Sequence, residues 1–111
     1  MLEKIINDVT NWHRETFPEA DAESQVRKLE EELREYYDSY DDSELADVLI
    51  CSIALWRRFK QNIGQAVFVY ASHIISASKA NLIVGEKMKI NRARNWQKID
   101  GVYRHVESGQ R

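Results

Sequence analysis

The sequence predicts an all-α fold, a bundle of four to five helices. Glycine and proline are rare, at 4 and 1 of 111 residues, so few turn signals interrupt the chain and long helices are expected. Apolar residues form 43% of the sequence and recur at three- and four-residue steps, which is the spacing of an amphipathic helix. This length and composition fit one domain. We expect a helical domain over residues 1–96 and a polar, irregular C-terminal tail over residues 97–111.

The first two helices are predicted by apolar stripes and by the residues that bound them. One helix is expected over residues 2–16, because a residue that precedes proline, here Phe17, avoids the α region. A second is expected from Asp21 or Glu23 to Tyr40. Its apolar stripe comprises Val26, Leu29, Leu33, Tyr36 and Tyr40.

The third predicted helix, residues 44–61, begins after the turn at 41–43 and is apolar on nearly every face. Such a helix is buried on all sides, which in a small chain indicates central packing together with a subunit interface. We therefore predict a homo-oligomer, a homodimer or homotetramer. A break is expected at residues 62–64, followed by an apolar segment at 66–77 and a last helix at 80–94.

Composition and charge exclude several classes of protein. Cys51 is the single cysteine, so no internal disulfide can form, and the sequence shows neither a secretory signal nor an apolar run long enough to cross a bilayer. We expect a cytoplasmic protein without a membrane partner. Nucleic-acid binding is disfavoured, because the isoelectric point is about 5.9 and no basic stripe stands alone.

Acidic and basic residues separate along the chain. Half of the 18 acids lie between residues 30 and 47, whereas residues 57–104 are mostly basic in their charged positions. The two regions are either a helix pair held by charge or the two halves of a site for a metal-bound polyphosphate. The acids of the first region are Glu30, Glu31, Glu32, Glu35, Asp38, Asp41, Asp42, Glu44 and Asp47.

Two pairs of acids have the spacing of a metal site. Glu32 and Glu35 share one helical face, and Glu44 and Asp47 have the same three-residue spacing on the next helix. Antiparallel packing of these helices brings the four carboxylates together, where mutual repulsion demands a cation. A set of oxygen ligands favours Mg²⁺, or Mn²⁺, over zinc. Asp47 is the sharpest indication, because a carboxylate on a buried helix needs a metal or a basic partner.

Each acid also has a simpler interpretation. The acids at 30–35 fit the solvated face of a surface helix. Glu44 fits a capping box with Asp41, and Asp47 fits a salt bridge with an arginine. Cys51 fits a packed thiol, and His13 fits a structural role.

The last helix carries a matching basic set. Lys87, Asn91 and Arg94 lie on one face, which continues the apolar stripe of Ile83 and Val84 and therefore points inward. Lysine and arginine suit phosphate oxygens, and asparagine can bond a phosphate or a base edge. The alternative is a basic helix that faces water, with Arg94 pairing a core acid. Trp12 and Trp96 fit either core packing or stacking on a base.

These motifs together resemble the MazG-like all-α nucleoside triphosphate pyrophosphohydrolases. The motifs are Leu29-x-Glu31-Glu32-x-x-Glu35, Glu44-x-x-Asp47 and Lys87-x3-Asn91-x2-Arg94-x-Trp96. Trp12-x3-Thr16-Phe17 and Asp100-Gly101-x3-His105 resemble a phage-associated branch described as dATP/dGTP pyrophosphohydrolase-like. The linker between Glu35 and Glu44 is shorter than in many relatives, and the stretch from Gly64 to Lys87 is longer.

The resemblance implies a helical oligomer that hydrolyses a nucleoside triphosphate to monophosphate and pyrophosphate, with water attacking the α-phosphorus. It implies that Glu32, Glu35, Glu44 and Asp47 hold Mg²⁺, and that Lys87, Asn91 and Arg94 bind the substrate, with Trp12 and Trp96 as further candidates. Glu31 would orient the attacking water, or it would be an acid that surrounds the metal ligands without binding the metal. The predicted catalytic residues are Glu31, Glu32 and Glu35. Two other functions fit the sequence: a non-catalytic helical dimerisation or interaction module, and a MazG-fold nucleotide binder without turnover.

Overall fold

The computed structural model describes residues 2–106 and is mostly helical, as predicted. The described chain is not all-α, because its C-terminal end forms a two-stranded antiparallel sheet. The remainder of the predicted tail, 107–111, lies outside the described residues. The elements in chain order are α1 (Glu3–Thr16), α2 (Ala22–Ser39), α3 (Asp42–Ile53), the π-helical turn η1 (Ala54–Arg58), α4 (Asn62–His73), α5 (Ala77–Ala93), β1 (Asn95–Ile99) and β2 (Val102–Val106).

The ends of α1 and α2 lie where local residues predicted them. Helix α1 stops at Thr16, before the Phe17-Pro18 pair. Asp21 caps α2: its carboxylate accepts from the Ser24 backbone N–H at 2.8 Å, while the Ser24 hydroxyl accepts from the Asp21 backbone N–H at 3.1 Å. Helix α2 ends at Ser39, and the left-handed backbone of its C-cap residue Tyr40 (φ 57°) turns the chain into α3.

The predicted third helix is divided, and its end was placed wrongly. Helix α3 passes into the wider turn η1, and the break falls at Lys60, which has a left-handed backbone (φ 60°), instead of at residues 62–64. Asn62 instead begins α4. Gly64 serves close packing, since a Cβ there would lie 2.6 Å from the Trp56 backbone nitrogen. Helix α5 begins earlier than predicted, because the Ser76 side chain caps it by accepting from the Lys79 backbone N–H.

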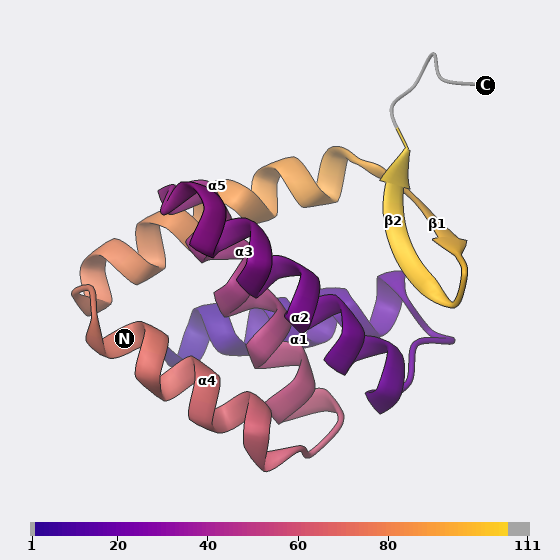
Figure 1. Cartoon of the computed structure of the whole chain (residues 1–111), viewed down its shortest axis with the longest axis horizontal. Coiled ribbons are helices and arrows are strands. Elements are labelled where there is room, and N and C mark those ends of the chain that lie inside the picture. Colours follow the sequence, from indigo (N-terminus) through magenta and orange to yellow (C-terminus); the bar gives the residue numbers. More distant parts are fainter. Residues whose placement is uncertain (1, 107–111) are drawn as a thin grey trace.

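Helix α3 lies at the centre of the molecule and packs against the other four α-helices (Figure 1). From Leu45 to Leu55 every residue except Asp47 is buried within this one chain. The apolar character of α3 is therefore accounted for by its own neighbours, and it no longer argues for a subunit interface. The homo-oligomer stays a prediction.

The hairpin corrects the prediction of an irregular tail. Strands β1 and β2 pair in register around the two-residue turn Asp100-Gly101, and both turn residues have positive φ (53° and 78°). An Asp-Gly pair is favoured in such a turn, because both residues tolerate this backbone. The predicted boundary at residue 96 falls inside β1. The hairpin (yellow in Figure 1) lies at one end of the molecule's long axis, beyond α5.

No single helix in residues 2–106 is long and apolar enough to span a membrane. Helices α4 and α5 reach that length and composition only as a pair, which is bent by 115° at the break between them.

Candidate active site

A cavity of about 570 Å³ opens between α2, α3, α5 and the hairpin, with the end of α1 beside it. All ten residues that the sequence predicted for the site line this cavity. From the acidic helices these are Glu31, Glu32, Glu35, Glu44 and Asp47; from α5 and its end they are Lys87, Asn91 and Arg94; the aromatic pair is Trp12 and Trp96.

Three carboxylates converge in this cavity. Glu32 and Glu35 of α2 and Glu44 of α3 each offer one oxygen, and these oxygens lie within 4.8 Å of one another. The short turn between α2 and α3 brings the end of α2 close to the start of α3. Glu32 and Glu35, three residues apart on α2, therefore lie near Glu44 in the first turn of α3. An all-oxygen donor set of this kind fits a hard divalent cation. The capping box proposed for Glu44 does not form, since α3 has no side-chain cap.

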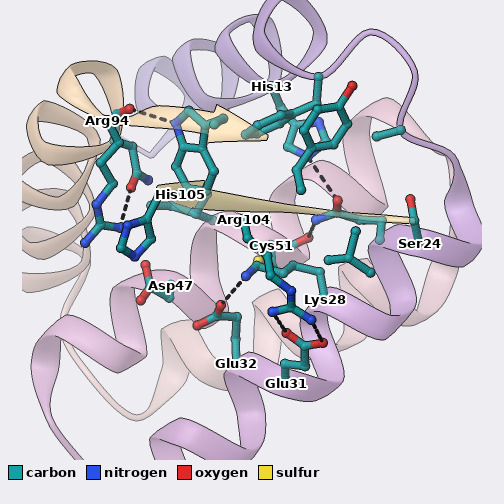
Figure 2. A pocket seen from close by; sticks show the side chains of 18 of the residues that line it. His13, Ser24, Lys28, Glu31, Glu32, Asp47, Cys51, Arg94, Arg104 and His105 are labelled. Carbon is teal, nitrogen blue, oxygen red and sulfur yellow. Dashed lines mark hydrogen bonds and ion pairs between the residues drawn. The ribbon is translucent and has the colours of Figure 1, made fainter. Parts of the chain in front are cut away.

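Asp47, the fourth predicted ligand, is engaged with a lysine instead. Its Oδ2 lies 3.3 Å from Lys87 Nζ, and both side chains are largely buried. Figure 2 shows Asp47 between Arg94 and Glu32. Burial raises the pKa of Asp47, and the ion pair with Lys87 opposes that rise. Asp47 therefore forms its salt bridge with a lysine, and not with the arginine that the sequence suggested.

Burial and neighbouring negative charge raise the pKa of two of these carboxyl groups. Burial, followed by the nearby charge of Asp47, raises the pKa of Glu32 from 4.5 to about 7. The same two causes raise the pKa of Glu44. A buried carboxylate that is hard to ionise gains from a bound cation, because the cation removes the cause of the repulsion.

Lys28 is a site residue that the sequence analysis missed. Its Nζ lies 3.2 Å from Glu32 Oε1, within the same cavity (Figure 2). Burial, the largest single influence, lowers the pKa of Lys28, but the acidic groups around it, with Glu32 first among them, together outweigh burial and the pKa is raised. The signal was present, since Lys28 precedes Glu32 by four residues and shares its face of α2.

Glu31 stands apart from the three convergent carboxylates. Its two oxygens accept hydrogen bonds from the two terminal nitrogens of Arg104, on β2, each at 2.8 Å. These bonds lower the pKa of Glu31, so it is readily ionised. Arg104 was also missed, and no local spacing reveals it, because it lies 73 residues from its partner.

Helix α5 supplies the basic wall of the cavity. Lys87 and Asn91 are 7% and 4% exposed, which rules out a basic face turned to water at these positions. Arg94, at the end of the helix, is half-buried and donates to the Asn91 side chain at 3.4 Å. The face predicted for α5 therefore points inward, opposite the carboxylates (Figure 2).

The other end of the cavity is aromatic. Trp12 and Trp96 meet edge to face at 6.0 Å, and Phe17 packs on Trp96 at 5.1 Å and on Tyr103 at 4.6 Å. All four rings line the cavity, so they combine mutual packing with an apolar wall. The tryptophans are half-buried, which leaves part of each ring accessible.

His13 has a structural role beside this wall. Burial, then the Arg58 charge, lowers the pKa of His13 to about 3, so the ring is neutral. Arg58 can only donate, hence His13 Nδ1 accepts from it at 2.9 Å and Nε2–H donates to Gln25 Oε1 at 3.0 Å. Cys51 is buried and its pKa is raised well above the usual value, as a packed thiol requires.

The fold and the cavity together define a small helical protein in which clustered carboxylates face a basic helix across one pocket. No family model matches the chain, and no curated protein matches it. Among solved structures, the chain is similar to a MazG-like pyrophosphohydrolase of cyanophage S-2L, bound to dGDP and three catalytic Mn²⁺ ions per active site. The two are 26% identical, the match covers 96% of this chain and 98% of that one, and the TM-score is 0.48.

Proposed function

We propose that the chain is a divalent-cation-dependent nucleoside triphosphate pyrophosphohydrolase that releases nucleoside monophosphate and pyrophosphate. The observation that carries this proposal is the opposition of two charge sets in one cavity. Three carboxylate oxygens lie within 4.8 Å of one another on one wall, and the buried Lys87 and half-buried Arg94 line the other. A triphosphate with a bound divalent cation would suit both walls, because its cation would pair with the carboxylates and its phosphates with the lysine and the arginine.

The residues divide between cation and phosphate. Glu32, Glu35 and Glu44 would hold Mg²⁺ or Mn²⁺, and Asp47 would join them once Lys87 turns from it toward a phosphate oxygen. A bound divalent cation supplies charge neutralisation on the phosphates and lowers the pKa of a water. Every other contribution is positional: Arg94 and Asn91 would hold the phosphates near the carboxylates.

The aromatic end supports a nucleotide over a simple polyphosphate. Trp12 and Trp96 offer faces on which a base can stack, and the cavity of about 570 Å³ lies within the range of pockets that enclose ligands of this size. The metal and aromatic ends belong to the same cavity, as the two ends of a nucleoside triphosphate require.

The test is a product assay with matched variants. Purified protein is incubated with each ribo- and deoxyribonucleoside triphosphate and Mg²⁺ or Mn²⁺, and mono-, di- and pyrophosphate products are separated. We expect monophosphate and pyrophosphate with at least one nucleotide, lost in Glu44→Gln and kept in Glu30→Gln. Glu30 is the control because it is an exposed acid on α2 that does not line the cavity.

Two results would overturn the proposal. Diphosphate with inorganic phosphate would place the attack at the terminal phosphorus. Tight binding of nucleotide, detected as a rise in melting temperature, without any product would indicate a binder without turnover.

A further inference from the structure

The pair between Glu31 and Arg104 joins two parts of the chain at the cavity wall. Arg104 lies on β2 and Glu31 on α2, and both line the cavity. Two parallel hydrogen bonds of 2.8 Å fix the carboxylate in plane and in rotation (Figure 2). A single contact would leave the carboxylate free to turn, whereas this fork geometry holds it in one orientation.

The pairing leaves Glu31 with accepting capacity. An ionised carboxylate offers about four lone-pair positions, and the guanidinium group occupies two of them. Glu31 is about one-third exposed, so its remaining positions are accessible to water. It stands next to Glu32 in sequence, yet it is outside the group of three convergent carboxylates. Glu31 is therefore placed to accept a hydrogen bond from a water near the metal-binding acids.

Arg104 is itself held by the hairpin's anchors. The indole N–H of Trp96 donates to the Asn91 carbonyl at 3.0 Å, which fastens β1 to the end of α5. The ring of Phe17 packs on both Trp96 and Tyr103, one from each strand. The hairpin thus connects the basic helix α5 on one side with the acidic helix α2 on the other, and the ion pair of Arg104 with Glu31 is one of its contacts with α2.

We propose that Arg104 is a positioning residue for the hydrolysis: it orients the Glu31 carboxylate so that Glu31 accepts a hydrogen bond from the attacking water. The C-terminal hairpin is in this way part of the active site. The inference rests on the proposed function. It predicts that Arg104 acts through Glu31, and that it contacts neither the nucleotide nor the metal.

The experiment is a double-mutant cycle on kcat and KM with the nucleotide that the product assay identifies. The variants are Arg104→Ala, Arg104→Lys, Glu31→Gln and the double variant, with Lys98→Ala as control, because Lys98 is an exposed cation on the same hairpin that does not line the cavity. We expect Arg104→Ala to lower kcat about 10- to 100-fold with little change in KM, as misplacement of a catalytic group does. Arg104→Lys should recover part of the loss, and Arg104→Ala should add nothing once Glu31 is glutamine.

A readout besides turnover completes the test. Mn²⁺ affinity, followed by electron paramagnetic resonance, should change less than about twofold in Arg104→Ala. A larger loss of Mn²⁺ affinity, an effect on KM alone, or independent effects of the two substitutions would overturn the proposal. A lowered melting temperature of Arg104→Ala with unchanged turnover per folded molecule would also overturn it, since the pair of Glu31 and Arg104 would then only stabilise the fold. A wild-type protein that turns over no nucleotide defeats the proposed function as well, whereas an Arg104→Ala variant with the kcat of wild type defeats this inference alone.

Discussion

Replacing Glu32 with glutamine is expected to stabilise the metal-free protein at neutral and alkaline pH. Glu32 is 6% exposed, and its pKa is raised from 4.5 to about 7. An acid whose pKa is higher in the folded state stabilises the fold fully below pH 4.5, and that contribution is lost as the pH rises through 7. At about 1.4 kcal/mol for each tenfold change in proton affinity, ionising Glu32 costs about 3 kcal/mol at pH 8. Glutamine keeps the shape and removes that cost.

The assay is urea denaturation in the presence of a chelator at pH 5 and pH 8. The free energy of unfolding of wild type should fall by about 2–3 kcal/mol more over this interval than that of Glu32→Gln. Glu30→Gln is the control, because Glu30 is an exposed acid on the same helix, and its pH dependence should match wild type. Millimolar Mn²⁺ at pH 8 should restore wild type and affect Glu32→Gln much less.

Equal pH dependence in wild type and Glu32→Gln would refute this reasoning, since it would mean that Glu32 is solvated or permanently neutralised by Lys28. A Mn²⁺ effect as large in Glu32→Gln as in wild type would show that the cation binds elsewhere.

Three further predictions concern the basic wall of the cavity, the packing of α4 and the assembly. Arg94→Ala should lower kcat/KM for every nucleotide about 10- to 100-fold in steady-state assays, because a charged hydrogen bond to phosphate is worth about 1.5–3 kcal/mol. Its melting temperature should be nearly unchanged, and a large fall would instead mean that Arg94 stabilises the fold. Gly64→Ala should lower the free energy of unfolding by about 1–3 kcal/mol in urea, because its Cβ would meet the Trp56 backbone nitrogen at 2.6 Å; an unchanged value would contradict that close approach. Light scattering should show a homodimer or homotetramer at micromolar concentration, and Tyr70→Glu should weaken it if the exposed Tyr70 and Ile74 lie in the interface; a wild-type monomer would refute the assembly.

Much of the fold was predictable because its determinants are local. Pro18 ends α1 and Asp21 caps α2, and each acts within a few residues of its position. The break at Lys60 was not predictable in this way, because a lysine in a left-handed backbone gives no sequence signal. Hydrogen bonds from Lys60 Nζ to the Arg57 carbonyl and from the Gln61 backbone N–H to the Leu55 carbonyl accompany this turn. The hairpin did have a signal, the Asp100-Gly101 pair, but the polar composition around it favoured an irregular tail.

The candidate site likewise has some residues that local spacing predicts and others that depend on how distant elements pack. The carboxylates of Glu32, Glu35 and Glu44 were predictable, because three-residue spacing on two successive helices determines where they meet. The pairing of Asp47 with Lys87 depends on how α5 crosses α3, which spacing within either helix does not determine. The partner of Glu31 lies on the hairpin, where the sequence predicted an irregular tail.

The hairpin also has a consequence for the order in which the molecule is completed during synthesis. The cavity draws on Trp12 near the start of the described chain and on Arg104 near its end, so its wall closes only after residue 104 has been made. Domains begin to fold from the N-terminal side as they emerge, and the central helix α3 with its neighbours α1, α2 and α4 precedes the hairpin in the chain. A nascent chain can therefore bring its carboxylates together before the cavity is complete, so a complete cavity requires that the chain has folded as far as β2.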